Sequence, residues 1–171
     1  MRALLALLLA CSAVAGGGCA LPGEVRHAAP AGAASQPQPA QVLRVVDGDT
    51  IIARVAGRRE RIRYIGIDTP ESVKPDTPVQ CFALAASRRN KRLIGGRKVT
   101  LRFDVERRDR YGRLLAYVYR DPDGLFVNAD LVRGGYAVPM TIPPNVRHAD
   151  EFVRLAREAR RAGRGLWSAC R

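Results

Sequence analysis

The fold is decided by residues 50–68, which read TIIARVAGRRERIRYIGID. Residues 50–55 are rich in β-branched side chains, and residues 59–67 alternate charged with aliphatic side chains, which is the period of a half-buried strand. Gly57 lies between these runs, where a tight turn favours glycine. The stretch therefore predicts a β-hairpin with one face toward a hydrophobic core.

Further runs extend this hairpin into a larger sheet with helices. The sequence predicts more strands at 43–46, 98–104 and 114–120, and helices at 80–94, 127–133 and 149–162. The last helix carries its apolar residues on one face at helical spacing. Five strands, with one helix after the third and others at the end, fit a small closed barrel of the OB type. The expected fold class is therefore α+β, mainly β, with three helices.

Acidic residues flank the hairpin at ends that should meet in space. Asp49 begins one strand and Asp68 ends the next. Clustered carboxylates are costly unless a partner neutralises them, and a hard cation favours clustered oxygen ligands. We therefore predict a cation site formed by Asp49, Asp68 and the Thr69 carbonyl. Glu71 lies just beyond it, whereas Asp47, in an Asp-Gly pair, is predicted to shape the turn.

Two arginines are candidates for binding phosphate beside this cation. Arg63 precedes Asp68 on the same strand, and Arg113 follows Tyr111-Gly112 at the start of the run 114–120. Guanidinium groups can bind phosphate oxygens bidentately and stabilise a five-coordinate, phosphorane-like transition state. In a chain with 29 Lys and Arg residues, a single arginine is more often a solvated surface charge. The motifs around Arg63 and Arg113 must therefore decide whether these two arginines bind phosphate or are surface charges.

The whole chain is basic, with a formal net charge of +13 over 171 residues. This charge favours a polyanionic partner such as nucleic acid or an acidic surface. An arginine-biased genome would give the same composition, so composition alone does not choose. The length suits one export signal and one compact domain. Nothing in the sequence requires more than a monomer, which is the state we expect.

The N-terminus is typical of an export signal, which we place at residues 1–18. Arg2 supplies a positive charge, residues 3–9 are apolar, and residues 13–15 offer an Ala-x-Ala cleavage site. The apolar stretch is too short for a comfortable membrane span. We therefore expect the mature protein outside the cytoplasm, either secreted or lipid-anchored at the cell envelope.

The residues after this signal predict an anchor point and a tether. Three glycines precede Cys19, which resembles a lipoprotein processing site, so lipidation of Cys19 and free secretion are both open. Residues 19–40 are rich in Ala, Pro, Gly and Gln and cannot bury a core, which predicts a flexible tether. The folded domain is then residues 41–171, with order beginning near Val42.

Two cysteines remain for the folded domain, Cys81 and Cys170. An even number of cysteines in an oxidising compartment favours a disulfide. We predict that a Cys81–Cys170 bridge ties the end of the chain to the start of the first helix. The alternative is two independent buried thiols. Zinc is not expected, because two isolated cysteines without a nearby histidine do not form a site.

Several motifs together resemble the staphylococcal (micrococcal) nuclease family. They are Asp47-Gly-Asp-Thr50, Arg63, Asp68-Thr-Pro-Glu71 and Tyr111-Gly-Arg113-Leu-Leu-Ala116-Tyr117. Each motif is weak alone, but their order and spacing are specific, and the resemblance runs from about Val42 to Trp167. It implies an OB-fold, calcium-dependent phosphodiesterase that acts on DNA and RNA and leaves 3′-phosphates.

The resemblance also implies a role for each candidate residue. It assigns three oxygen ligands to calcium, namely Asp49, Asp68 and the Thr69 carbonyl. It assigns three side chains to catalysis, namely Arg63 and Arg113 as phosphate-binding groups and Glu71 as the acid that orients or activates water. Tyr111 is a further candidate for contacting substrate, although packing would explain it equally.

One segment departs from the family's pattern. The family places aromatic side chains after the second helix, where they stack on a substrate base. In residues 136–144 the only aromatic is Tyr136, which lies earlier than those positions. Base stacking contributes about 1–3 kcal/mol per base. We therefore expect base binding to differ from the family's, while the phosphate chemistry is unaffected.

Two other functions would also suit a basic OB-fold protein. The first is a catalytically inactive OB module that only binds nucleic acid at the cell envelope. Such a binder gains nothing from Asp49, Asp68 and Glu71 facing a polyanion without a cation. The second is an envelope protein that binds anionic polymers, which explains the charge but not the motifs.

Overall fold

The protein is described by a computed structural model, which covers residues 36–72 and 78–170. These residues belong to one compact unit, Gly32–Arg171. Its elements follow in the order β1 (Gln38–Val45), β2 (Thr50–Val55), β3 (Arg58–Tyr64), β4 (Ile67–Asp68), α1 (Ala83–Ile94), β5 (Lys98–Arg102), β6 (Leu114–Arg120), β7 (Leu125–Phe126), α2 (Val127–Arg133), β8 (Val138–Pro139), α3 (Ala149–Arg161) and α4 (Leu166–Ala169).

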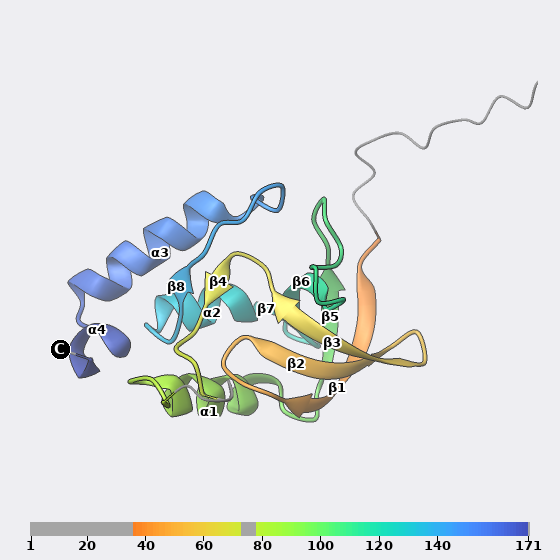
Figure 1. The fold of residues 1–171 in the computed structure, drawn as a ribbon, viewed down its shortest axis with the longest axis horizontal. Coiled ribbons are helices and arrows are strands. Elements are labelled where there is room, and N and C mark those ends of the chain that lie inside the picture. Colours follow the sequence, from red (N-terminus) through yellow and green to blue (C-terminus); the bar gives the residue numbers. More distant parts are fainter. Residues whose placement is uncertain (1–35, 73–77, 171) are drawn as a thin grey trace, which may run out of the picture. The chain divides into compact units, whose positions relative to one another are not determined.

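Five strands close into a mixed barrel, as the sequence predicted (Figure 1). Strands β3, β2, β1, β5 and β6 pair in this order, each antiparallel to the next. A parallel pairing of β3 with β6 closes the ring and sets Arg63 opposite Leu115. Closure removes the free edges that would otherwise remain on β3 and β6. It also brings Arg113, just before β6, alongside the strand that carries Arg63.

The alternating pattern of the hairpin decides which side chains fill the barrel. Ile51, Ile62 and Tyr64 are at most 2% exposed, whereas Arg59 and Arg61 on β3 are exposed. Burying the aliphatic face contributes about 25 cal/mol for each Å² of apolar surface removed from water. The charged face of β3 therefore points away from the core.

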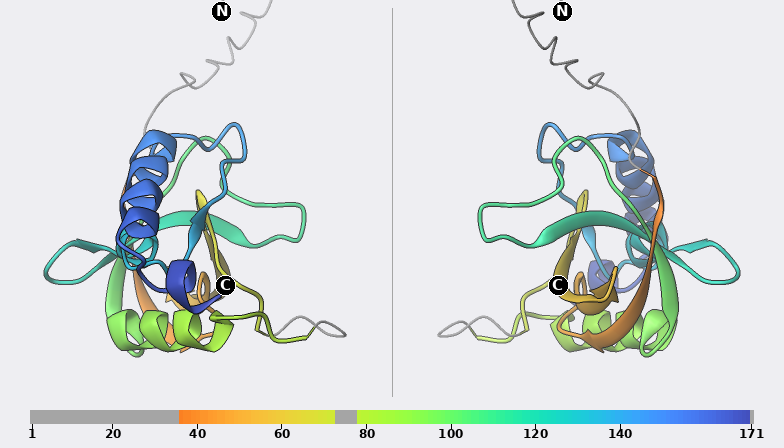
Figure 2. Two further views of the ribbon diagram at one scale, coloured as in Figure 1. Left: turned by 90° about the vertical axis from the view of Figure 1, so that its left-hand side faces the viewer. Right: turned by 90° about the vertical axis from the view of Figure 1, so that its right-hand side faces the viewer.

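The helices pack around the barrel rather than inside it (Figure 2). Helix α2 contacts β6 on one side and α3 on the other, and α1 contacts β1 and α2. Asn128 of α2 is fully buried, and its amide donates to the Ile65 carbonyl (2.9 Å) and accepts from the Val118 backbone N–H (3.0 Å). This side chain fixes α2 against the strands that lead into the candidate site.

The structure differs from the expected elements in several places, and the short strands β7 and β8 were not predicted. β1 begins at Gln38, inside the expected tether, because Gln38 to Gln41 pair with β5. The expected strand 59–67 is interrupted at Gly66, which adopts φ +79° and has the Phe152 ring only 2.5 Å from where a Cβ would lie. The chain therefore turns there, and β4 pairs with β8 instead. The short helix α4 was not predicted.

A disulfide joins Cys81 to Cys170, with an S–S distance of 2.02 Å and a sequence separation of 89. It links the segment before α1 to the end of α4, as the sequence predicted. No helix among residues 36–72 and 78–170 has the length and apolarity to cross a membrane. The expected export signal and Cys19 lie outside the described residues.

Candidate active site

Arg63 is held in a fixed orientation by the backbone of its own segment. Its Nη1 donates to the carbonyl of Ile67 (2.8 Å) and to that of Tyr64 (3.2 Å). The side chain is only 13% exposed. Two backbone acceptors and partial burial leave the guanidinium little freedom, so its other N–H donors have fixed directions.

The two acids predicted to share one end of the barrel both contact this arginine. Asp49 Oδ1 lies 3.1 Å from Arg63 Nη1, and Asp68 Oδ1 lies 2.7 Å from Arg63 Nη2. The acids flank the hairpin in sequence, since Asp49 precedes β2 and Asp68 ends β4, but the pairing of Thr50 with Arg63 puts both at the same end of it. One guanidinium therefore brings together the carboxylates that the sequence placed apart.

Asp49 is the more buried of the two acids, at 4% exposure. Its Oδ2 accepts hydrogen bonds from the Thr69 backbone N–H (2.7 Å) and the Thr69 hydroxyl (2.8 Å). Burial raises the pKa of the Asp49 carboxyl to about 6, although the Arg63 charge and the Thr69 hydrogen bonds oppose that rise. Glycine is required at Gly48, where a Cβ would lie 2.6 Å from the Thr69 hydroxyl oxygen.

Asp47 has the turn role that the sequence predicted. Its Oδ1 accepts from the Asp49 backbone N–H (3.0 Å), which closes a turn of the kind that Asp favours. Its carbonyl accepts from the Asn90 amide of α1 (3.1 Å). Asp47 thus orients the segment that carries Asp49.

Arg113 is held by a turn in the loop before β6. Its Nε donates to Asp109 Oδ2 (2.7 Å) and its backbone N–H to Asp109 Oδ1 (3.0 Å). Burial alone would raise the pKa of Asp109, but these hydrogen bonds and the Arg113 charge outweigh it and lower the pKa below its usual value. Asp109 therefore remains ionised and holds Arg113.

A single cavity of about 470 Å³ is lined by both arginines, Arg63 and Arg113. Its other lining residues include three apolar side chains that sequence analysis did not select, namely Leu115, Met140 and Ile142. Met140 follows β8, and its sulfur lies 3.9 Å from Arg63 Nη2. The cavity thus combines two cationic groups with an apolar wall.

Tyr111 lies at the rim of the same cavity, and it is 68% exposed. Its hydroxyl accepts from Arg110 Nη2 (2.7 Å), and the Arg113 guanidinium carbon lies 5.4 Å from its ring centroid. This exposure excludes a core packing role and leaves the ring free to meet a ligand.

Glu71 does not line the cavity, and neither do three other predicted site residues, Asp49, Asp68 and Thr69. Its backbone exchanges two hydrogen bonds with Gln80, since Gln80 Oε1 accepts from Glu71 N (2.7 Å) and Glu71 O accepts from Gln80 N (3.0 Å). Its Oε1 accepts from the Ser72 N–H (2.8 Å). Gln80 therefore anchors the backbone of this acid.

A known protein family matches most of the described domain. The family model of the staphylococcal nuclease homologues matches residues 61–169. This chain belongs to that family. The matched span includes the candidate residues from Arg63 to Arg113 and Cys81, and it ends one residue before Cys170.

Relatives from Staphylococcus and Bacillus cover a similar part of the chain. The thermonuclease of Staphylococcus hyicus is 39% identical over 128 residues, which is 75% of each chain. That of Staphylococcus intermedius is 43% identical over 126 residues, or 74% of each chain. Endonuclease YncB of Bacillus subtilis is 42% identical over 127 residues, covering 73% of this chain and 59% of the relative.

Within this family member, the two carboxylates in contact with Arg63 are donors that suit a hard cation. The described residues contain no cluster of three or more His, Cys, Asp or Glu side chains that could hold a metal ion. The predicted set instead combines two carboxylates with a backbone carbonyl, all oxygen donors of the type that Ca²⁺ accepts. Asp49 and Asp68 converge on Arg63, and the raised pKa of buried Asp49 shows that further positive charge would stabilise its ionised form.

The sequence prediction did not include three residues that the structure places near the candidates, namely Gln80, Asp109 and Met140. Asp109 stands four residues before Arg113, and an Asp before a Tyr-Gly turn is a signal that could have found it. Gln80 and Met140 carry no local signal, because their contacts, to Glu71 and Arg63, depend on the folded chain.

Proposed function

We propose that this protein is an exported, calcium-dependent nuclease that hydrolyses phosphodiester bonds in DNA and RNA. The observation that carries the proposal is the cavity lined by both Arg63 and Arg113, with Asp49 and Asp68 beside Arg63. Family membership and the names of the relatives, thermonuclease and endonuclease, support the same activity.

The two arginines are proposed to bind the scissile phosphate. Each guanidinium can donate two parallel hydrogen bonds to phosphate oxygens. Arg63 is fixed by two backbone carbonyls, so it can turn donors toward a phosphate without reorganising. Such preorganised donors stabilise the additional charge of a five-coordinate transition state more than they stabilise the substrate.

Calcium is proposed to be held by the Asp49 and Asp68 carboxylates and the Thr69 carbonyl. When bound, the ion would neutralise phosphate charge and favour attack on phosphorus. The Thr69 backbone N–H and hydroxyl hold one oxygen of Asp49, which orients that carboxylate before any ligand arrives. The proposed contacts are hard oxygen donors throughout.

Glu71 is proposed to orient the attacking water and to accept its proton. A carboxylate is a weak base, so positioning contributes more than proton abstraction. In-line attack with loss of the 5′-oxygen would leave 3′-phosphate products. The Gln80 contacts support this role by fixing the Glu71 backbone.

The direct test is digestion of plasmid and single-stranded DNA, and of RNA, by the mature protein. Cleavage is expected with calcium and is expected to stop with a chelator. The product ends are then assigned with a phosphatase that removes only terminal phosphates, followed by 3′-end extension. Absence of calcium-dependent cleavage would reject the proposal, and 3′-hydroxyl ends would reject its bond assignment alone.

The alternative, an inactive nucleic-acid-binding module, is not favoured. All six site positions implied by the family resemblance are present, and the arginines share one cavity. The digestion assay separates the two functions, because a binding module would shift DNA in a gel without cutting it, with or without calcium.

Export and lipidation are proposed together with the activity. The disulfide supports a location outside the cytoplasm, since thiols there are oxidised. Cell fractionation tests the location, and metabolic labelling with a fatty acid tests Cys19. An unlabelled mature protein in the medium would favour free secretion, whereas a cytoplasmic protein would reject export.

A further inference from the structure

Four arginines lie in register on the outer face of the β1–β2–β3 sheet. Arg44 pairs with Ile52, and Ile52 pairs with Arg61, in one row across the strands. In the next row Arg54 pairs with Arg59. Directly paired residues of antiparallel strands point to the same face, as do alternate residues of one strand. We call this set, Arg44, Arg54, Arg59 and Arg61, the arginine face.

No carboxylate of the described residues forms an ion pair with the arginine face, although all four of its side chains are exposed. Glu60, between Arg59 and Arg61, points to the other side of β3, where Arg108 binds both of its oxygens (2.9 and 3.1 Å). Arg54 opposite Arg59 sets like charges directly across two strands, which destabilises the sheet. The face therefore favours a negatively charged ligand.

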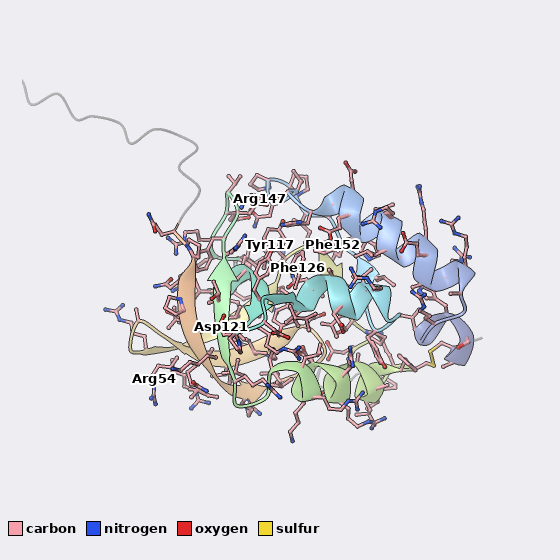
Figure 3. All side chains as sticks on the ribbon, turned by 180° about the vertical axis from the view of Figure 1, so that it is seen from behind. Arg54, Tyr117, Asp121, Phe126, Arg147 and Phe152 are labelled. Atoms are coloured by element: carbon pink, nitrogen blue, oxygen red, sulfur yellow. A yellow bond between two sulfur atoms is a disulfide. The ribbon has the colours of Figure 1, made fainter. Side chains whose placement is uncertain are left out.

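The arginine face leads into the candidate site along β3. Arg59, Arg61 and Arg63 occupy alternate positions of this strand, so they share one side and advance by about 6.6 Å at each step. This step is comparable to the distance between successive phosphates of an extended single strand. Because Arg63 lines the cavity, the row ends where the scissile phosphate is proposed to bind. Figure 3 shows Arg54 on the strand side of the domain, away from α3.

We propose that the arginine face binds the phosphodiester backbone of the nucleic acid strand that extends beyond the scissile phosphate. The inference rests on the proposed function and identifies the substrate as a polynucleotide rather than a short oligonucleotide. Contacts to phosphates carry no base information, so this binding is independent of sequence. Continuity with Arg63 selects a nucleic acid strand over an anionic lipid surface.

The test compares two doubly substituted proteins of equal net charge. Arg59→Gln/Arg61→Gln removes two charges from the face, and Arg157→Gln/Arg161→Gln removes two exposed charges from α3 as a control. Binding of long single-stranded DNA is measured over a salt series, with a chelator to prevent cleavage. Each phosphate contact on a single strand contributes about 0.7 to the salt slope, so the face variant should lower the slope by about 1.4. The control should leave it unchanged.

Cleavage gives a second readout that separates this inference from the proposed function. With calcium, the face variant should lower kcat/KM several-fold on long DNA and leave it unchanged on a dinucleoside monophosphate. An unchanged salt slope, or an equal loss in the control variant, would overturn the inference. Binding to anionic lipid vesicles is measured in parallel. If the face variant lost vesicle binding but not DNA binding, the inference would be overturned in favour of a membrane partner. If the salt slope fell as expected but the unsubstituted protein cleaved no substrate, the result would support phosphate binding by the arginine face and reject the proposed function.

Discussion

The two arginines of the candidate site are held in contrasting ways. Arg63 is part of a barrel strand, and its guanidinium contacts two backbone carbonyls and two carboxylates. Arg113 ends a loop, and its guanidinium is fixed by the single carboxylate of Asp109, four residues earlier. Arg63 is thus built into the tertiary structure, whereas Arg113 is held by its own turn. Loss of Arg63 should affect folding and chemistry, and loss of Arg113 chemistry alone.

The largest effect is expected from Arg63→Ala. It removes a transition-state donor, which lowers turnover about 100- to 1,000-fold. It also leaves buried Asp49 without its cationic partner, which costs about 3 kcal/mol of unfolding free energy. Turnover on DNA and denaturant unfolding measure the two effects. A variant of normal stability would contradict the structural role given to this arginine.

Arg113→Ala is expected to lower turnover by a similar factor, about 100- to 1,000-fold, without lowering the melting temperature appreciably. Asp109, its carboxylate partner among the described residues, is partly exposed and can be hydrated. Comparing the melting temperatures of the two arginine variants is therefore the sharpest test of the contrast. Equal destabilisation would show that the loop is as integral to the fold as the barrel strand.

Asp109→Asn should have an intermediate effect. Asparagine preserves the shape of the turn but loses the charge that holds the Arg113 guanidinium, so we expect turnover to fall about tenfold through misplacement of that group. The same change in the Arg113→Ala background should have no further effect, because nothing remains to be positioned. An additive loss in the double variant would indicate that Asp109 acts on its own.

Thr69→Val should have the smallest effect of the four. It removes the hydroxyl that donates to Asp49 and costs about 1 kcal/mol of stability. The proposed ligand is the Thr69 backbone carbonyl, which valine retains, so the calcium concentration needed for half-maximal activity should rise only a few-fold. A complete loss of calcium activation would show that the hydroxyl itself is required.

The parts of the fold and the site that could be predicted are those with a local sequence pattern. The hairpin could be predicted because its side chains alternate, and Arg63, Asp49 and Asp68 sit in motifs at its ends. The strand 114–120 and the helix 127–133 were predicted with the bounds that the structure gives. These elements have strong local patterns, so the sequence is sufficient to find them.

Features that depend on distant contacts could not be predicted in this way. The first part of β1 is rich in Gln, Pro and Ala, and it forms a strand by pairing with β5 and, from Ala40, also with β2. Met140 and Ile142 take their places in the cavity through the pairing of β8 with β4. The Phe152 ring, which leaves no room for a side chain at Gly66, lies far along the chain.

The Cys81–Cys170 disulfide divides the two halves of the site topologically. It closes the residues between these cysteines into a covalent ring that contains Arg113, while Asp49, Arg63 and Asp68 precede the ring. A pulling force applied between the two chain ends would pass through the sulfur atoms and bypass the ring. It would therefore extend only the segment before Cys81 and strip β1, β2 and β3 away from a loop that stays closed. For a chain tethered by its N-terminus, mechanical load would fall on the half that holds Arg63.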